Sequence, residues 1–385
     1  MALLARLHRR HLVAFVLSLA TSIASACVAP TTHASKLSPG VLRAEQLKQQ
    51  QLVIQSEISE QSRLENIAFP MLRSAVPFCG QWVTTRMGIG VANVSAYNKD
   101  YREAARALGL TDTLSVVRVT AGSAAERAGV KIGDRVTAIP GKPTSTGATA
   151  ATDFTERVRP PSNSRSQATL ASEPVRLTVR RSAEQNVASF VDVPIAVAAD
   201  TVCAYRVTAL KDETLNAWAD GQQVFVTTAM MRFAGTDDEL SVVASHEIAH
   251  NVMRHMDAKK KNSIAGGIFG AILDVAAATQ GINTAGGFTK QGAEAGAMTY
   301  SQDFEREADY VGLYILARSG KPFATAPNFW RRMAQESPGS IKYASTHPTS
   351  AERFIRLEST VAEIQRKQAE NLPLNPDVKS PPKPQ

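Results

Sequence analysis

The 385-residue sequence has few cysteines, few basic clusters and no apolar run as long as the roughly 20 residues that a membrane-spanning helix needs. It contains three cysteines, and its formal net charge of +8 includes one dense basic run, Lys259–Lys261. No aromatic residues are interleaved with that run. We therefore interpret it as a solvated face that can approach anionic lipid head groups, and we expect no nucleic-acid partner.

The motif with the clearest chemistry is His246-Glu247-Ile248-Ala249-His250. Residues four apart lie on one face of a helix, so both imidazoles can reach one metal ion. Glu247 lies about 100° further round the helix, where it can act as a general base on water. Thr236 and Glu239 predict a capping box at the start of this helix. Taken alone, the motif could also belong to a helix whose two histidines bind no metal.

A pair of carboxylates downstream favours the metal site. Glu305 and Asp309 are four residues apart and share one helical face. Catalytic zinc often takes two histidines and a glutamate, with water in the fourth position. Glu305 is therefore the candidate third ligand, and Asp309 can accept a proton from a histidine ring and fix its tautomer. Glu307 lies about 200° from Glu305 and is expected to point elsewhere, toward a salt bridge or solvent.

These pieces, in this order, resemble an HtpX-like gluzincin metallopeptidase, the family that also holds the CAAX prenyl proteases. The resemblance covers about residues 205–366. The matching segments are Asn216-Ala217, Val224-Phe225-Val226-Thr227, the HEIAH motif, Glu305–Asp309 with Gly312, and Thr346-His347-Pro348 with Arg353. The membrane-spanning members carry several long apolar spans and this chain does not, so it resembles the soluble periplasmic branch.

The resemblance implies a set of site residues. It implies one Zn²⁺ per chain held by His246, His250 and Glu305, with Asp309 behind the ligands. It implies that His347 lies near the metal, either as a catalytic group that stabilises the transition state or as a reserve ligand. Residues expected to contact substrate are Asn216, Val224, Val226 and Arg353. The strand from Val224 to Thr227 would pair with an extended polypeptide.

The N-terminus predicts export. Arg6, Arg9 and Arg10 precede an apolar run from Leu12 to Ala20, and small residues then lead to Cys27. This is the pattern of a secretory signal peptide over residues 1–26. Cys27 after small residues resembles a bacterial lipobox, which predicts a lipid anchor; simple cleavage after Ala26 is the alternative. Since valine and not aspartate follows Cys27, we expect a periplasmic protein tethered to the outer membrane.

The other two cysteines, Cys79 and Cys203, form one possible pair. A disulfide persists in the oxidising compartment that an exported protein reaches. Two unrelated buried thiols are the alternative.

Residues 87–198 are expected to form a β-rich domain. Val116–Val119 alternates like a strand, residues 121–130 predict a short helix, and Gly133-Asp134 predicts a turn. This order resembles the PDZ domains of bacterial proteases, and Met87–Val91 resembles their carboxylate-binding loop. The resemblance implies a site for peptide C-termini. A spacer that positions the other domain is the alternative.

The remaining segments complete the domain organisation. Residues 27–86 predict an amphipathic helix from Val41 to about Leu72, packed on a domain. The Gly/Ala-rich segment Ser263–Ala297 predicts a mobile helical lid or hairpin beside the active site, because its apolar part is too short to span a membrane. Residues 369–385 are rich in proline and predict a disordered tail.

Together these features predict an α+β fold. A mostly helical gluzincin domain at 199–368 would hold the HExxH helix and a small edge-strand sheet, beside the PDZ-like domain. The expected function is that of a zinc-dependent metalloendopeptidase that hydrolyses periplasmic or envelope proteins, including misfolded ones, in protein quality control. The alternatives are a chaperone or assembly factor with a silenced or plugged zinc site, and a hydrolase of non-peptide substrates. The sequence names no substrate, cleavage site or oligomeric state.

Overall fold

The computed structural model describes residue 32 and residues 35–139, 141–159, 173–183, 186–280, 282–298, 301–336 and 351–377. They fall into two units, residues 1–48 and residues 49–385, and the first contributes the opening turns of helix α2 to the description. The predicted signal peptide, Cys27 and His347 lie outside the described residues. The predicted α+β fold class is confirmed.

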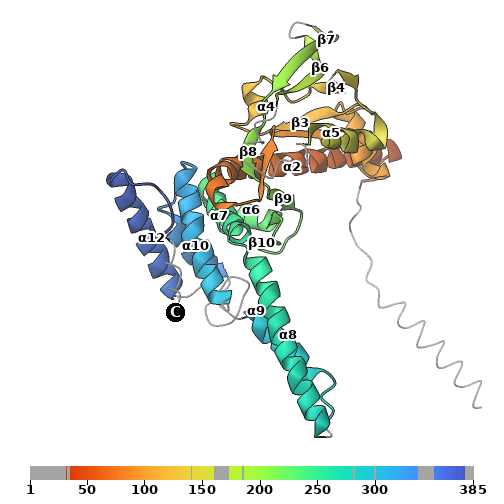
Figure 1. Ribbon diagram of the computed structural model, residues 1–385. Helices are drawn as coiled ribbons and strands as arrows, with labels where there is room; N and C mark the ends of the chain where they lie inside the picture. The colour runs from red at the N-terminus through yellow and green to blue at the C-terminus, as the bar shows by residue number, and fades with distance from the viewer. Residues whose placement is uncertain are drawn as a thin grey trace, which may run out of the picture. The chain divides into compact units, whose positions relative to one another are not determined.

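The second unit contains a helical region that is built from both ends of the chain (Figure 1). Its elements are α2 (Pro39–Ser74), η1 (Val76–Phe78), β1 (Val83–Arg86), β8 (Asp200–Cys203), β9 (Arg206–Leu210), β10 (Ala217–Ala219), β11 (Gln223–Thr227), α6 (Thr228–Ala234), α7 (Asp237–Val252), α8 (His255–Thr279), α9 (Gly287–Met298), α10 (Ser301–Arg318), α11 (Ala326–Glu336) and α12 (Ala351–Ala369). The predicted amphipathic helix is α2, and its residues from Leu64 to Leu72 pack in the core of this region.

The small sheet of the helical region has the strand order β10-β11-β9. β11 runs parallel to β9 and antiparallel to β10. Helix α7 is fastened to this sheet by Asn251, whose side chain donates to Gln223 O (2.9 Å) and accepts from Gly221 N (2.7 Å). The hydroxyl of Tyr205 donates to the backbone oxygen of the same asparagine (3.0 Å). The sheet therefore fixes the C-terminal end of α7.

Helix α7 begins where its acidic first turn predicts. The hydroxyl of Thr236 accepts a hydrogen bond from Glu239 N (3.3 Å), which satisfies one of the free amides of the first turn. The Glu239 carboxylate does not complete a capping box, because it pairs with Arg332 at 2.8 Å. After α7, Arg254 adopts a left-handed conformation with φ 59°, and α8 starts in a new direction.

A second, β-rich region lies between β1 and β8 in the sequence. Its elements are β2 (Ile89–Ala92), η2 (Val94–Ala96), η3 (Lys99–Tyr101), α3 (Arg102–Ala107), β3 (Ser115–Val119), α4 (Ala124–Arg127), β4 (Arg135–Ile139), β5 (Lys142–Pro143), η4 (Gly147–Thr149), α5 (Ala150–Val158), β6 (Val175–Ala183) and β7 (Asn186–Val197). The sheet order is β2-β3-β4-β6-β7, with β5 beside β4. Leu114, Val116, Val136 and Val179 fill a separate core.

A disulfide joins Cys79, which follows η1, to Cys203 at the end of β8, with the two Cα atoms 5.9 Å apart. Strand β1 pairs antiparallel with β8 beside it. Both cysteines are buried in the core of the helical region.

The segment after Ala369 departs from the predicted disordered tail. Residues 370–377 return along α12 and α10, where Lys367 Nζ donates to Asn375 O (2.8 Å) and Asp377 N donates to the hydroxyl of Tyr310 (2.9 Å). Leu374 packs against the core. The prediction of disorder is therefore wrong for residues 370–377.

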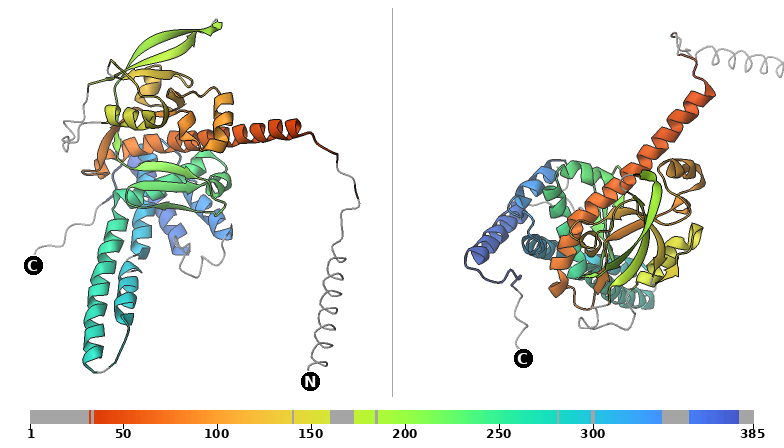
Figure 2. Two further views of the ribbon diagram at one scale, coloured as in Figure 1. Left: turned by 90° about the vertical axis from the view of Figure 1, so that its right-hand side faces the viewer. Right: turned by 90° about the horizontal axis from the view of Figure 1, so that it is seen from above.

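Helices α8 and α9 lie side by side as a hairpin that projects from the helical region (Figures 1 and 2). Helix α8 has 25 residues and is longer than the apolar run within it. Among the described residues it is the one helix that is long and apolar enough to cross a membrane, and 6% of its apolar window is buried.

Candidate metal centre

The two helices that carry the predicted ligands pack against each other. Helix α7 presents His246 and His250, and α10 presents Glu305. Gly312 on α10 permits the close approach, because a Cβ there would lie 3.2 Å from Ser245 O and 3.3 Å from the His246 Cα. All three candidate ligands are at least 95% buried.

The donor atoms of these three side chains converge on one point. His246 Nε2 lies 3.2 Å from His250 Nε2, 3.3 Å from Glu305 Oε2, and His250 Nε2 lies 3.4 Å from Glu305 Oε1. Zinc–nitrogen and zinc–oxygen bonds of about 2.0–2.2 Å in a tetrahedron place ligand atoms about 3.3–3.5 Å apart. The three separations, together with the His₂Glu donor set, therefore fit a zinc ion.

Asp309 holds the ring of His246. Its Oδ1 lies 2.9 Å from His246 Nδ1, so that nitrogen carries the proton and Nε2 is directed toward the metal position. On its other side Asp309 receives two hydrogen bonds from Arg353, from Nε at 2.7 Å and from Nη2 at 2.8 Å. The guanidinium lies 4.0 Å from the Trp330 ring centroid, and Trp330 meets the His246 ring edge-on at 5.3 Å.

These contacts correct the expectation that Arg353 binds substrate. The side chain is 5% exposed and both oxygens of Asp309 engage it. Removing one partner of such a buried ion pair costs about 3–5 kcal/mol. Arg353 therefore anchors the residue that orients His246.

The two histidines have opposite pKa shifts before a metal binds. Burial alone lowers the pKa of His246, but hydrogen bonds to Asp309 and Glu305 outweigh it and raise that pKa to about 9. Burial lowers the pKa of His250 to about 4. Burial raises the pKa of Asp309, but the charge of Arg353 and the hydrogen bond to His246 outweigh it and bring the value to about 2. The carboxylates around His246 and the burial of His250 therefore push the two pKa values in opposite directions.

The ring of His250 is held by a second histidine that the sequence analysis missed. His255 Nδ1 lies 2.9 Å from His250 Nδ1, and His255 Nε2 lies 2.9 Å from Glu307 Oε2. A proton on His250 Nδ1 leaves its Nε2 lone pair for the metal, and a proton on His255 Nε2 serves Glu307. His255 is 1% exposed and stacks on Phe304 at 4.7 Å. Glu307 makes a salt bridge, as expected, but its partner is His255, which contacts the candidate ligand His250.

Glu247 lies beside the ligands and is 2% exposed. Its charge raises the pKa of both His246 and His250. The structure therefore brings together His246, Glu247, His250, Glu305 and Asp309.

The strand that was predicted to bind substrate, β11, lies in the middle of its sheet and not at an edge. β11 is the central strand, paired on one side with β9 and on the other with β10, and Val224 and Val226 are fully buried. Since neither edge of β11 is free, the expectation that these two valines bind substrate is wrong. Within the described residues β10 has an open edge, and half-buried Asn216 immediately precedes it, with its backbone oxygen bound by Thr227 N (3.1 Å).

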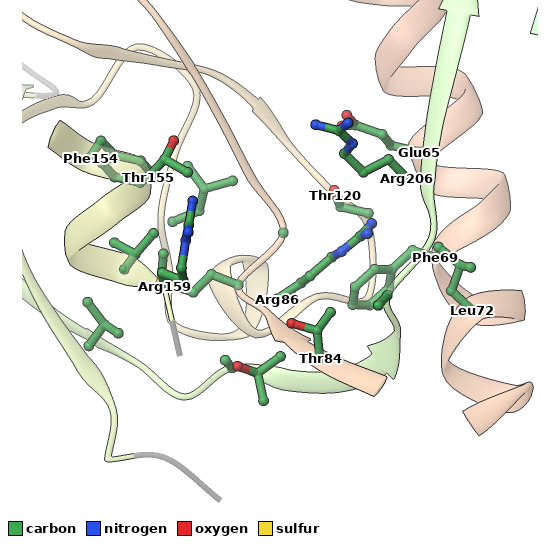
Figure 3. A pocket seen from close by; sticks show the side chains of 18 of the residues that line it. Glu65, Phe69, Leu72, Thr84, Arg86, Thr120, Phe154, Thr155, Arg159 and Arg206 are labelled. Carbon is green, nitrogen blue, oxygen red and sulfur yellow. The ribbon is translucent and has the colours of Figure 1, made fainter. Parts of the chain in front are cut away.

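A second candidate site is a cavity of 980 Å³ between the β-rich region, α2 and β9 (Figure 3). The predicted carboxylate-binding loop lines it with Met87, Gly88 and Ile89, and α5 lines it with Phe154 and Val158. Arg86 also lines the cavity, and its guanidinium donates to Tyr205 O (2.8 Å). β2 is an edge strand of its sheet, so an extended chain can pair with it.

Comparisons with known proteins agree with this geometry. Residues 181–361 match the model of peptidase family M48, and residues 115–153 match a PDZ domain model. A beta-barrel assembly-enhancing protease of Yersinia pestis is 31% identical over 146 residues, which are 36% of this chain and 29% of that protein. The mitochondrial metalloendopeptidase OMA1 of Schizosaccharomyces pombe is 30% identical over 178 residues, which are 45% of this chain and 51% of that protein. The chain thus spans about half or less of these relatives.

Among solved structures, the PDZ domain of HtrA3 bound to a phage-derived ligand covers 31% of this chain and 88% of that one, with 18% identity and a TM-score of 0.21. That score is too low to support an argument from its ligand. The two family matches confirm the predicted gluzincin peptidase with a PDZ domain. The chain therefore carries a peptidase family M48 domain over residues 181–361 and a PDZ domain that includes residues 115–153.

Proposed function

We propose that the protein is a zinc-dependent metalloendopeptidase that cleaves exported polypeptides. The observation that carries the proposal is the convergence of His246 Nε2, His250 Nε2 and a Glu305 oxygen within 4.8 Å, beside the buried Glu247. Family M48 metallopeptidases are zinc-dependent. We infer one ion per chain, because one such group of three occurs among the described residues.

His246, His250 and Glu305 would hold the zinc, which when bound lowers the pKa of water to about 7 and polarises the scissile carbonyl. Glu247 takes a proton from the attacking water on its carboxylate and returns it to the amide nitrogen as the C–N bond breaks. Asp309 and His255 keep the two imidazoles in the tautomers that direct Nε2 inward. His347 is proposed, from the family resemblance, as a group near this centre.

The open edge of β10 supports a proposal for substrate binding. An extended polypeptide that pairs with Ala217–Ala219 gains backbone hydrogen bonds with little sequence preference. The PDZ cavity beside Met87 and Gly88 is proposed to hold a peptide C-terminus, which would tether a substrate while its chain is cut. Misfolded envelope proteins fit both modes, because they offer extended segments and free ends.

Localisation rests on the N-terminus and the disulfide. A signal peptide over 1–26 and the Cys79–Cys203 bond both fit an oxidising compartment outside the cytoplasm. We propose that Cys27 is lipidated and tethers the protein to the outer membrane. Mass spectrometry of the mature N-terminus tests this directly, since a diacylglyceryl group on Cys27 supports the anchor and a free thiol there refutes it.

Casein digestion tests the enzymatic proposal. The purified protein should cut casein, lose activity in a zinc chelator and recover it on addition of zinc, as expected for a site whose metal polarises the carbonyl. Binding of unfolded casein without cleavage in zinc-replete protein would instead indicate a chaperone or assembly factor. Hydrolysis of small esters alone would indicate a non-peptide substrate.

A further inference from the structure

The α8–α9 hairpin buries small residues and exposes large ones. A Cβ on Gly266 would lie 2.0 Å from Gly292 O, and one on Gly292 would lie 2.2 Å from Gly266 O. Gly270 and Gly296 make equally close contacts, with Phe288 O and Asn262 O. The two backbones therefore touch, and little room is left for apolar side chains between them. Small residues spaced four apart on both helices are typical of helix pairs in membranes.

A row of exposed apolar side chains on α8 lies away from these glycines. It consists of Ile264, Ile268, Ile272 and Val275, which we call the apolar stripe, and each is between 54% and 66% exposed. Phe269 (64% exposed) and Leu273 (40% exposed) lie outside this row. The stripe's spacing of four, four and three residues keeps its members on one side of the helix, about 120–180° round from Gly266. A contiguous exposed row of this kind marks an interaction surface.

The charges of the hairpin lie elsewhere. Lys290 and Glu294 on α9 are exposed and lie about 160° to either side of Gly292, so they point away from α8. Asp274, the one charge in α8 after Lys261, receives hydrogen bonds from Phe288 N (3.1 Å) and from Thr289 N and Oγ1 (2.8 and 2.7 Å). The hairpin is thus apolar on one side and charged on the other.

The base of the hairpin is basic. Lys259, Lys260 and Lys261 precede the apolar stripe on α8, and no ion pair joins them to a carboxylate of the described residues. Lysines beside an exposed apolar stripe complement the head groups of anionic lipids.

We propose that the hairpin lies in the surface of a bilayer that contains anionic lipid, with the apolar stripe immersed and Lys259–Lys261 against the head groups. The stripe spans 11 residue steps, or about 17 Å, which is short of the roughly 30 Å hydrocarbon core. Lys290 and Glu294 would also oppose full insertion. The hairpin therefore lies along the interface, with α9 on the water side. This contact is independent of any lipid on Cys27.

Vesicle flotation tests the proposal with Cys27→Ser protein, which carries no lipid. The protein should float with vesicles of phosphatidylethanolamine and phosphatidylglycerol and much less with phosphatidylcholine. Ile268→Asp/Ile272→Asp should weaken binding at least about tenfold, since it puts two charges where apolar area is buried. Gln291→Asp on α9 is the matched control and should bind like the parent. Thermal melting of each variant shows whether it is folded.

Three results would overturn the proposal: no binding by the parent protein, equal binding by the double variant, or loss of binding by Gln291→Asp. A dimer in solution that the double variant dissociates would show that a second copy covers the stripe, and would overturn it as well. All variants should digest casein equally, because the stripe lies outside the catalytic site. Flotation is read without proteolysis, so failure of this proposal and failure of the enzymatic one are distinguishable.

Discussion

At the residue scale, each of the two proposed ligand histidines is oriented by its own carboxylate. His246 is held directly by Asp309, which Arg353 anchors, whereas His250 is held through His255 by Glu307. Such partners fix the tautomer and raise the basicity of the ligand nitrogen. These two chains of contacts, which we call arms, both join α7 to α10, and the second passes through His255 on α8. Helices α7, α8 and α10 must therefore all be in place before the site can bind metal tightly.

Substitutions in the two arms should distinguish the zinc ligands from the residues that orient them by how much zinc affinity each one loses. Asp309→Ala and His255→Ala should each weaken zinc binding about 10–100-fold, because the free ring can turn or change tautomer. Glu305→Ala should lose zinc altogether, since two ligands hold the ion poorly. Glu307→Ala should retain zinc with a smaller loss of affinity, because its carboxylate is 46% exposed and acts through His255.

Competition with a chromogenic chelator measures these affinities. Asp303→Ala is the matched control, because Asp303 lies on α10, pairs with Arg306 and is 59% exposed. Zinc affinity in His255→Ala equal to that of the parent would show that the second arm plays no part.

At the scale of elements, the sequence predicted what depends on local spacing. The faces of α7 and α10 follow from residues four apart, and the short helix expected within residues 121–130 is α4. The errors concern contacts between distant segments. Whether β11 is central depends on β9 and β10, and whether Arg353 meets substrate or Asp309 depends on the packing of α12 on α10. His255 carried a weak signal, a histidine five residues after His250, but its partner lies 52 residues away.

The turn of the α8–α9 hairpin depends on Asp274. Hydrogen bonds from Thr284 and then Thr289 lower the pKa of this half-buried carboxylate to about 2. A lowered pKa means that its stabilising contribution is complete above the ordinary aspartate value and is lost as the pH falls through about 2. At neutral pH, Asp274→Ala should speed hydrogen exchange of the Phe288 and Thr289 amides, which lose their acceptor. Glu294→Ala is the control, and unchanged exchange in Asp274→Ala would contradict this role.

At the scale of the molecule, the disulfide joins the segment that follows α2 to β8, the strand before the β10-β11-β9 sheet. Cys79 and Cys203 are 124 residues apart, and the β-rich region lies in the loop that they close. The bond therefore lies within the helical region and closes the loop that contains the PDZ domain. Its main effect should be on the unfolded chain, which loses freedom when a long loop is closed.

Removal of this bond should lower stability without removing the active site. Cys79→Ala/Cys203→Ala should lose up to about 5 kcal/mol in the free energy of unfolding, the order that chain entropy gives for a loop of this length. Urea denaturation measures the loss, and Cys27→Ser serves as the control with no change expected. Peptide mapping without reductant that finds both cysteines alkylated would refute the bond itself.

The most direct test of the account is Glu247→Gln, assayed for zinc and for proteolysis together. Glu247 is proposed as the base and His246, His250 and Glu305 as the ligands, so the amide should keep about one zinc per chain while casein cleavage falls by several orders of magnitude. Retention of substantial proteolysis would remove Glu247 from the mechanism. Loss of zinc from folded Glu247→Gln protein would contradict the assignment of the ligands.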